Sequence, residues 1–308
     1  MFESDEYELL DLGAGRKLER FGPYTIDRPS PAAATAKRGA AELWEQADAR
    51  FERQAGQRGR WTFRRQIAAT WPIQFGPMKL GLRFSDFGQV GIFAEQAANW
   101  DWIAAQVGAN DEPMRVLNLF GYTGASSLAA AAVGAEVTHV DAARNVVAWA
   151  RRNAATSHME QAPIRWIAED ALTFMRRELK RRRQYDAVIL DPPAYGHGPK
   201  GQEWKLADQL GELLELCLEL MGNGGRFLLL TAHSGELSGA EGLLKAAITS
   251  APGLQRRGKI MASDMFLHST SGGKLHCGAV VRWTAPVADA ESSPIADKSA
   301  RPRSARCP

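Results

Sequence analysis

The sequence is poor in cysteine, has no long apolar run and carries almost no net charge. Its three cysteines are far apart and odd in number, which argues against a disulfide framework or a zinc cluster and indicates a reducing compartment. No apolar run approaches the roughly 20 residues of a membrane span, and the acidic N-terminus lacks the apolar core of a signal peptide. A net charge of +3 over 308 residues gives no strong overall attraction to nucleic acid or membrane. These absences predict a cytoplasmic protein that holds no metal and contacts no membrane.

What the sequence does contain, from residue 116 onward, is a regular alternation of strand and helix patterns. Short apolar segments bounded by turn residues predict strands, and amphipathic segments between them predict helices. This alternation indicates a doubly wound α/β fold, with a parallel sheet covered by helices on both faces. Strands are expected near 116–120, 136–140, 164–167, 186–190, 226–231, 258–262 and 275–284, and helices include 96–107, 143–155 and 208–221.

The composition changes on both sides of this α/β region. Residues 1–95 are rich in glycine, aromatic residues and strand patterns, and predict a small β-rich domain that serves as a substrate platform. This domain begins with a hairpin in residues 7–22, whereas residues 32–53 favour a helix. Residues 96–285 would form the α/β domain, and the Ala-, Ser-, Pro- and charge-rich residues 286–308 a disordered tail.

Basic and aromatic residues interleave in one stretch of the β-rich domain. Such a pattern can hold nucleic acid through phosphate contacts and stacking, but it equally suits a solvated sheet edge above a small aromatic core. Residues 1–105 contain 14 Lys and Arg against 14 Asp and Glu, which weakens the nucleic-acid interpretation. The stretch comprises Arg58, Arg60, Trp61, Phe63, Arg64, Arg65 and Trp71.

The stretch Val116–Ala125 has the pattern of a strand, a tight turn and a helix N-terminus. Gly121 and Gly124 would let a ligand approach the main chain, and such a turn leaves backbone N–H groups unpaired. In doubly wound sheets, ligands bind at the carboxyl ends of strands where the strand order reverses. Taken alone, the turn is equally compatible with a strand-to-helix connection that binds nothing.

Two acidic residues follow the next two predicted strands. Asp141 comes twenty residues after Gly121, where a carboxylate can accept hydrogen bonds from both ribose hydroxyls. Asp170 is placed to accept a hydrogen bond from an adenine amino group, with the Ala171 N–H meeting a ring nitrogen. Each carboxylate is also a plausible cap for the helix that follows it. Nicotinamide enzymes use an acidic residue in the same way, but their G-x-G-x-x-G turn is absent, which argues against a dehydrogenase.

The most specific feature is Asp191-Pro192-Pro193-Ala194-Tyr195, directly after the apolar strand 188–190. The two prolines fix the backbone and remove donors, so that carbonyl groups can point into a cleft. Asp191 and those carbonyls would accept hydrogen bonds from an exocyclic amine or a ring edge, and Tyr195 would stack on a base. This arrangement would orient a flat nucleophile in line with a methyl group. The alternative is a rigid strand-to-loop turn.

From Tyr7 to Trp283 the chain resembles bacterial class I S-adenosylmethionine (AdoMet) methyltransferases of the large-subunit ribosomal RNA group. This group is related to the cytosine-C5 enzymes and to the guanine-N7 module of fused rRNA methyltransferases. The resemblance implies the seven-stranded, Rossmann-like class I methyltransferase fold, AdoMet as cofactor and ribosomal RNA as the default substrate. It rests on residues 117–124, 140–141, 169–170 and 191–195, with further similarity at 16–22 and 91–96.

Together, the motifs and the resemblance imply two sets of site residues. The expected catalytic residues are Asp191, Pro192, Pro193 and Tyr195. The expected cofactor-binding residues are Gln96, Asn118, Phe120, Gly121, Tyr122, Thr123, Gly124, Asp141, Ala142, Asp170, Ala171 and Asp191.

One departure from the family pattern concerns the methylated atom. Methylation of cytosine C5 needs a thiolate that adds to C6, and in the cytosine-C5 enzymes this cysteine lies just after the fifth strand. The corresponding residues 229–235 contain no cysteine; His233 is the nearest polar side chain, as a base or, the favoured interpretation, as a loop residue. A nitrogen acceptor, which needs positioning rather than covalent activation, fits better. A small-molecule or protein acceptor, a non-catalytic AdoMet- or RNA-binding module, and a homodimeric assembly stay open.

Overall fold

The N-terminal part of the chain forms a small β-structure of its own. The computed structural model describes residues 2–39, 41–54, 58–110, 112–197, 203–233 and 235–286. Five strands pair in the order β1-β2-β3-β4-β5, parallel between β3 and β4 and antiparallel elsewhere, and the hairpin β6-β7 follows. The hairpin expected in residues 7–22 is present as β1-β2. These strands are Tyr7–Gly13 (β1), Arg16–Phe21 (β2), Tyr24–Pro29 (β3), Ala49–Arg53 (β4), Gly59–Phe63 (β5), Trp71–Phe75 (β6) and Met78–Leu82 (β7).

The prediction of a helix in residues 32–53 is wrong. The structure has only the 3-10 turn η1 (Pro31–Ala33) and the short helix α1 (Ala41–Glu45) before β4 begins. The carboxylate of Asp48 explains the difference, because it accepts the backbone N–H of Thr25 at 2.9 Å and so fixes the start of β4 beside β3. Pairing with a distant strand therefore overrides the local helix preference.

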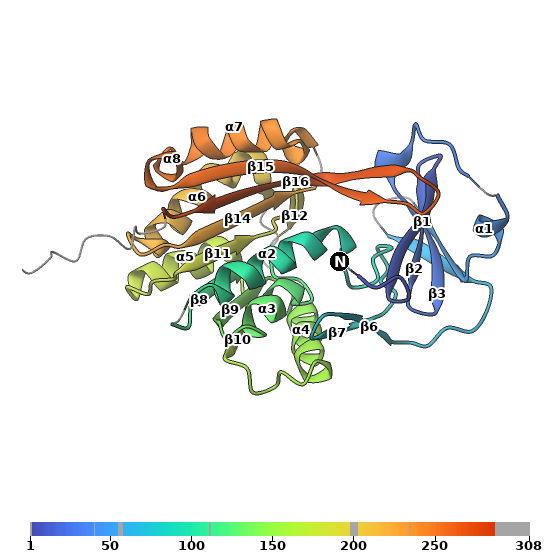
Figure 1. The fold of residues 1–308 in the computed structure, drawn as a ribbon, viewed down its shortest axis with the longest axis horizontal. Coiled ribbons are helices and arrows are strands. Elements are labelled where there is room, and N and C mark those ends of the chain that lie inside the picture. The colour runs from blue at the N-terminus through green and yellow to red at the C-terminus, as the bar shows by residue number, and fades with distance from the viewer. Residues whose placement is uncertain are drawn as a thin grey trace, which may run out of the picture.

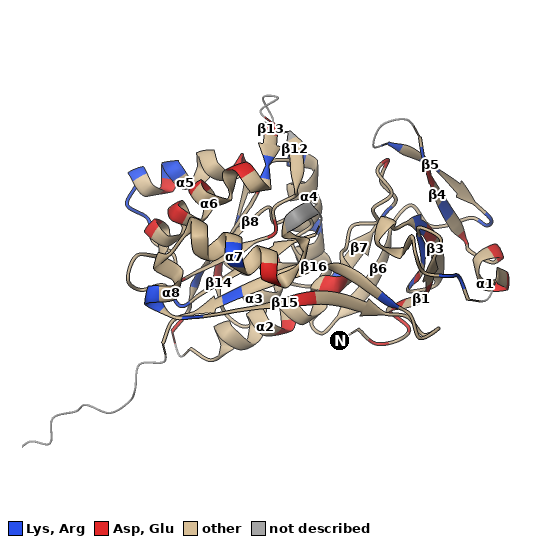
Figure 2. Ribbon diagram, turned by 90° about the horizontal axis from the view of Figure 1, so that it is seen from above, with Lys and Arg blue, Asp and Glu red and all other residues tan. Residues whose placement is uncertain are grey.

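The basic and aromatic residues of the stretch 58–71 are used largely within this N-terminal part. Trp61 packs on Phe84 with ring centroids 4.4 Å apart, and Arg65 forms an ion pair of 2.6 Å with Asp48. Lysine, arginine and acidic residues are mixed along the strands of this part (Figure 2). The interpretation as a sheet edge over a small aromatic core therefore describes this stretch.

The second part of the chain is built on a seven-stranded sheet with the order β10-β9-β8-β11-β14-β16-β15. The first five strands are parallel, and the last two form an antiparallel hairpin. The chain runs outward from β8 to β9 and β10 and then returns to place β11 on the other side of β8, so the strand order reverses between β8 and β11. The strands are Arg115–Leu119 (β8), Glu136–Asp141 (β9), Ile164–Ala168 (β10), Ala187–Leu190 (β11), Phe227–Ala232 (β14), Lys259–His268 (β15) and Lys274–Thr284 (β16).

Helices cover both faces of this sheet, as a doubly wound fold requires (Figure 1). Successive strand residues face opposite helix layers: Leu117 and Val188 pack in the layer of α5, α6 and α7, and Val116 and Ile189 in the layer of α2 and α3. None of the described helices is long and apolar enough to cross a membrane. The helices are Ala97–Gly108 (α2), Ala125–Ala131 (α3), Arg144–Thr156 (α4), Ala171–Lys180 (α5), Leu206–Met221 (α6), Ala240–Ser250 (α7) and Gly253–Arg257 (α8).

The two parts are joined at places far apart in the sequence. The turn between β15 and β16 reaches β1 (Figure 1), where the Thr270 N–H donates to the Leu9 carbonyl oxygen at 2.9 Å. On the other side, the Asn153 side chain of α4 accepts the Gly81 N–H of β7 at 2.9 Å. A domain boundary at residue 95 stays a prediction. Of the expected disordered tail, residues 287–308 lie outside the described residues.

Candidate active site

The turn of residues 120–124, which joins β8 to α3, has an unusual backbone. Phe120 and Tyr122 have positive φ angles of 56° and 48°, although neither is glycine. Each such residue costs about 1–2 kcal/mol, and strain of this kind clusters at functional sites. Gly121 has no room for a side chain, because a Cβ there would lie 2.5 Å from the ring of His139 in β9. The conformation of the turn is therefore fixed by packing beneath it.

The expectation that this turn leaves backbone N–H groups unpaired is wrong at three positions. The Gly121 N–H donates to the Val140 carbonyl oxygen at 2.9 Å, and the Gly124 N–H donates to the Gly121 carbonyl oxygen at 3.0 Å. The Tyr122 N–H donates to Oδ2 of Asp141 at 3.0 Å. At these three positions a ligand could therefore contact the turn, but it would find no unpaired backbone N–H group to donate to it.

Asp141 at the end of β9 and Asp170 after β10 each accept backbone hydrogen bonds, and both line a hollow described below. Asp141 Oδ1 accepts the Ala143 N–H at 2.9 Å, just before α4. Burial raises the pKa of Asp141, although its backbone hydrogen bonds act against this shift. Asp170 is the N-cap of α5, since its Oδ1 accepts the Thr173 N–H at 2.9 Å. The helix-capping role considered for each carboxylate is therefore present.

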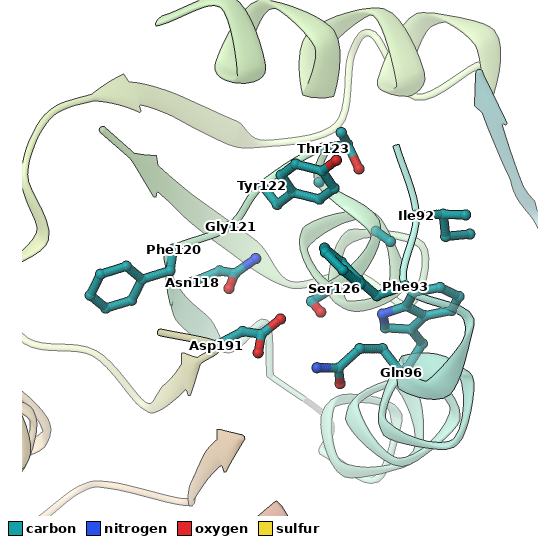
Figure 3. A pocket seen from close by; sticks show the side chains of 13 residues that line it. Ile92, Phe93, Gln96, Asn118, Phe120, Gly121, Tyr122, Thr123, Ser126 and Asp191 are labelled. Atoms are coloured by element: carbon teal, nitrogen blue, oxygen red, sulfur yellow. The ribbon is translucent and has the colours of Figure 1, made fainter. Parts of the chain in front are cut away.

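Asp191 follows β11, the strand across the reversal point from β8. Its Oδ1 accepts hydrogen bonds from Oγ1 of Thr231 at 2.5 Å and from Nε2 of His233 at 2.7 Å. The side chain keeps a quarter of its exposure. Figure 3 shows the Asp191 carboxylate and the Gln96 amide approaching each other beside Phe120. Residues far apart in the sequence thus meet at the carboxyl edge of the sheet.

The prolines after Asp191 do not direct all the following carbonyls into a cleft, contrary to the expectation. The Pro193 carbonyl oxygen accepts the indole N–H of Trp204 at 2.6 Å, and the Ala194 carbonyl oxygen accepts the Leu206 N–H at 3.0 Å. Tyr195 is 46% exposed at the start of a short hairpin. The strands of this hairpin are Tyr195–His197 (β12) and Glu203–Lys205 (β13).

All the predicted site residues line one of two adjoining hollows. The larger, here called the cleft, has a volume of about 630 Å³, within the range of small-molecule sites. The smaller, here called the recess, lies against the turn (Figure 3). The recess is lined by Gln96, Asn118 and Phe120–Gly124, the cleft by Asp141, Ala142, Asp170, Ala171, Pro192, Pro193 and Tyr195, and Phe120, Tyr122 and Asp191 line both.

A family model described as S-adenosylmethionine-dependent methyltransferase matches residues 33–269 of the chain. The chain belongs to this family. The methyltransferase is also similar, over almost its whole length, to a solved SAM-dependent methyltransferase from Agrobacterium tumefaciens. That similarity has 36% sequence identity and a TM-score of 0.84, and covers 91% of this chain and 90% of that one. A structure described as a SAM-dependent methyltransferase from Streptococcus mutans shares the fold, with 16% identity and a TM-score of 0.68 over 90% of this chain and 75% of that one.

Curated relatives of the methyltransferase match over a shorter region. A ribosomal RNA large subunit methyltransferase K/L from Hahella chejuensis is 32% identical over 151 residues, which are 47% of this chain and 20% of the relative. The enzyme of that name from Methylococcus capsulatus is 29% identical over 168 residues, 54% of this chain and 22% of the relative. The chain therefore spans about a fifth of the length of these relatives.

The cofactor of the methyltransferase is S-adenosylmethionine, and the residues of the site suit it. Carboxylates at three strand ends face the cleft, from Asp141, Asp170 and Asp191, and His139 fills the place of a side chain at Gly121. Such a site offers acceptors to ribose hydroxyls and amino groups and lets the ligand lie close to the main chain. Among the described residues, no group of three or more His, Cys, Asp or Glu side chains could hold a metal ion. The role of each site residue stays a prediction.

His233 lies in the site and not merely in a loop. The favoured interpretation was a loop residue, but the methyltransferase places its ring against Asp191, and Nδ1 lies 3.0 Å from the Cys277 carbonyl oxygen. The ring also stacks on Phe93, with centroids 6.2 Å apart. The hint in the sequence is that His233 directly follows the apolar run of β14; the structure then pairs β14 with β11, the strand that precedes Asp191.

The two cysteines in the described part of the chain are buried or partly buried and are poor candidates for a nucleophile. Cys217 is fully buried in α6, and burial raises the pKa of its thiol. Cys277 lies in β16 close to His233, and burial raises the pKa of its thiol to about 12. A thiol with such a pKa is almost wholly protonated at neutral pH and is a poor nucleophile. Cys307 lies outside the described residues.

Proposed function

We propose that this methyltransferase transfers the methyl group of AdoMet to a nitrogen of an RNA base, with ribosomal RNA as the substrate. The observation that carries the proposal is the position of Asp191, whose carboxylate lines both the recess and the cleft. Tyr195, exposed on the same cleft, offers a stacking surface for a flat acceptor. The rRNA methyltransferase names of the curated relatives support this substrate class.

Each part of the site has a role in this proposal. When bound, AdoMet supplies an electrophilic methyl group. The turn 120–124 with Gln96 and Asn118 would hold its amino-acid portion, Asp141 and Ala142 its ribose, and Asp170 and Ala171 its adenine. Asp191 to Tyr195 would orient the acceptor, so that alignment and the exclusion of water assist the transfer.

A third hollow supports a polymeric acceptor. This hollow, here called the groove, has a volume of about 440 Å³ and lies between the N-terminal sheet and the methyltransferase domain. It is continuous with the cleft, because Phe93 and His233 line both. The exposed side chains of Arg53 and Phe87 offer a cation for phosphate and a ring for stacking, as single-stranded RNA needs. The groove would thus guide an RNA strand to the cleft.

The test is methyl transfer from labelled AdoMet to protein-free rRNA from cells that lack this protein. We expect incorporation into RNA, and mass mapping would identify the base and the nitrogen. Asp191→Ala should abolish transfer and leave the dissociation constant of S-adenosylhomocysteine, measured by calorimetry, within about twofold of wild type. Asp5→Ala, at an exposed position outside the cleft, is the matched control.

The outcomes separate the alternatives. Transfer to a small molecule or a protein, with none to RNA, would contradict the substrate class. A lack of transfer to every acceptor, with the nucleoside still bound, would favour a non-catalytic binding module. An RNA substrate would place the protein in the cytoplasm, and a homodimer stays a prediction that light scattering of the full chain would check.

A further inference from the structure

The ring of His233 is held at both nitrogens by oxygen atoms. Nε2 lies 2.7 Å from Oδ1 of Asp191, and Nδ1 lies 3.0 Å from the carbonyl oxygen of Cys277. A backbone carbonyl and an ionised carboxylate accept hydrogen bonds and cannot donate them. With Asp191 ionised, both ring nitrogens face acceptors, and this geometry favours a proton on each nitrogen, which makes His233 an imidazolium.

The charges around His233 agree with this protonation state. Among the described residues, Asp191 after β11 and Glu95 of η2 (Ala94–Gln96) are the acids that face the ring, with Glu95 Oε1 4.0 Å from Nδ1. From β16, Cys277 contributes its carbonyl and a protonated thiol, and Phe93 and Gln96 are neutral. Burial would lower the pKa of His233, but the carboxylates of Asp191 and Glu95 and the Cys277 carbonyl raise it to about 9. The ring is thus a cation at neutral pH.

The same pair keeps Asp191 ionised. Burial alone would raise the pKa of Asp191, but the charge of His233 and hydrogen bonds from His233, Thr231 and Gln96 bring it below its ordinary value. The printed distances from Thr231 and His233 both end on Oδ1 of Asp191. Both strong donors therefore hold one oxygen, and the carboxylate can turn its other oxygen to the cleft that Asp191 lines.

A chain of amides fixes the neighbouring Gln96. Arg282 donates to Oδ1 of Asn99 at 2.6 Å, and Nδ2 of Asn99 donates to Oε1 of Gln96 at 2.6 Å. The Gln96 nitrogen is thereby turned towards Asp191 and Thr231, where it lies 3.4 Å from Thr231 Oγ1 and 3.2 Å from Nε2 of His233. When Nε2 of His233 carries a hydrogen, that hydrogen points to Asp191 and not to Gln96, because the Gln96 amide nitrogen can only donate.

We propose that His233 is a positioning residue for methyl transfer, which clamps Asp191 in one orientation while Asp191 accepts an N–H of the acceptor. With both ring protons engaged, His233 has no lone pair to act as a general base. A carboxylate paired with a cation is itself a weak base, so Asp191 orients the acceptor and does not deprotonate it in advance. This inference rests on the role proposed above for Asp191.

The first experiment compares the pH dependence of methyl transfer to RNA in wild type, His233→Gln and His268→Gln. Glutamine keeps one donor for Asp191 but has no charge, and His268 is an exposed histidine of β15 outside the cleft and the groove. In wild type, kcat should fall as the pH rises through about 9, because His233 then loses its charge. His233→Gln should lower kcat at neutral pH by about 10- to 100-fold, as loss of a charged hydrogen bond does. In this variant kcat should not fall as the pH rises through about 9. Its KM for RNA and its affinity for S-adenosylhomocysteine should stay within about twofold of wild type.

A merely structural role would lower stability and leave the alkaline fall in place. The His268→Gln control should keep the wild-type kcat and the wild-type pH profile. A His233→Gln enzyme with wild-type kcat and an alkaline fall would overturn the inference while leaving the proposed function intact.

The second experiment needs no turnover, and its main readout uses the wild-type protein. Nitrogen-15 NMR of the histidine rings in the wild-type protein should show both nitrogens of His233 protonated at pH 7. In Asp191→Asn the midpoint should fall towards the ordinary histidine value of about 6.5. A neutral His233 ring at pH 7 overturns the inference, even in an enzyme that is active on RNA. An enzyme inactive on every RNA contradicts the proposed function, and a doubly protonated ring would then still support the clamp on Asp191.

Discussion

Oγ1 of Thr123 donates a hydrogen bond of 2.7 Å to the carbonyl oxygen of Gly91, and this bond ties the turn of the recess to the segment that leads out of the N-terminal part. Gly91 itself has no room for a side chain, because a Cβ would lie 2.2 Å from the ring of Trp149 in α4. The segment also carries Phe93 and Gln96, which line the recess. The N-terminal part is therefore braced against the recess.

The Thr123→Val substitution tests this brace. Valine keeps the shape of threonine but leaves the buried Gly91 carbonyl without its donor, which typically costs about 1–3 kcal/mol of stability. We expect a lower melting temperature and weaker binding of S-adenosylhomocysteine, measured by calorimetry. Thr156→Val is the matched control, because Thr156 is exposed and its hydroxyl donates to the Arg152 carbonyl oxygen in the preceding turn of α4. Equal binding by Thr123→Val and wild type would show that the brace does not support the site.

Gly121 offers a sharper test of the turn. A methyl group there would meet the His139 ring at 2.5 Å, and overpacking of this kind costs about 1–3 kcal/mol. We expect Gly121→Ala to displace the turn and to weaken binding of S-adenosylhomocysteine by at least about tenfold. Gly224→Ala is the control, since a Cβ at Gly224 has no neighbour within 4 Å. Nucleoside affinity that survives in Gly121→Ala would mean that the turn does not contact the cofactor.

The sequence predicts the sheet of the methyltransferase and the edge where its site lies, because both depend on local patterns. Short strand patterns are recognisable in the sequence: Asp141 ends β9, Asp170 comes two residues after β10, and Asp191 directly follows β11. Parallel strands end at one edge of a sheet, so residues that follow them must gather there.

What the sequence could not predict depends on contacts between distant segments. The strand β4 replaces an expected helix because Asp48 pairs with Thr25, and His233 becomes part of the site because β16 brings the Cys277 carbonyl to its ring. The pairing of the Gly121 N–H with the Val140 carbonyl belongs to the same class. Local propensity contains no information about such partners.

Asp141 should make nucleoside binding sensitive to pH. Burial raises its pKa, so this carboxylate takes up a proton at a higher pH than an ordinary aspartate does. A protonated Asp141 accepts weaker hydrogen bonds from ribose hydroxyls and from the Tyr122 N–H. The affinity for S-adenosylhomocysteine should therefore weaken as the pH falls through the raised pKa of Asp141. Calorimetry between about pH 4 and pH 8 would show this fall in wild type. Asp141→Asn should bind about 10- to 100-fold more weakly at neutral pH and show little further change with pH; a wild-type profile in this variant would contradict the ribose role.

Cys277 tests whether a covalent intermediate is involved. Its thiol pKa is raised to about 12, and its backbone carbonyl oxygen lies 3.0 Å from Nδ1 of His233. Cys277→Ser should therefore transfer methyl groups to RNA at a rate within about twofold of wild type, since the carbonyl remains. Iodoacetamide should label this thiol slowly at neutral pH. A variant with no activity, together with a covalent adduct between wild type and RNA containing 5-fluorocytidine, would instead indicate attack by this thiol.

The groove predicts where the acceptor strand lies. Arg53 and Phe87 are exposed on its wall, from β4 and from the loop after β7, and neither lines the cleft. Removing one phosphate contact lowers the slope of log binding constant against log salt by about 0.7 for a single strand. Loss of one stacked base costs about 1–3 kcal/mol with little effect on that slope. Arg53→Ala should therefore weaken RNA binding and lower the salt slope, whereas Phe87→Ala should weaken binding alone.

The control for this pair is Lys245→Ala, an exposed cation on α7 that does not line the groove. Binding is best measured by fluorescence anisotropy with labelled single-stranded RNA at several salt concentrations. Both groove variants should raise KM for RNA and change kcat little, because neither residue reaches Asp191. If Lys245→Ala lowers the salt slope as much as Arg53→Ala does, the strand does not follow the groove. In that case RNA contacts the surface of α7, and the groove and cleft together would bind an acceptor smaller than an RNA strand.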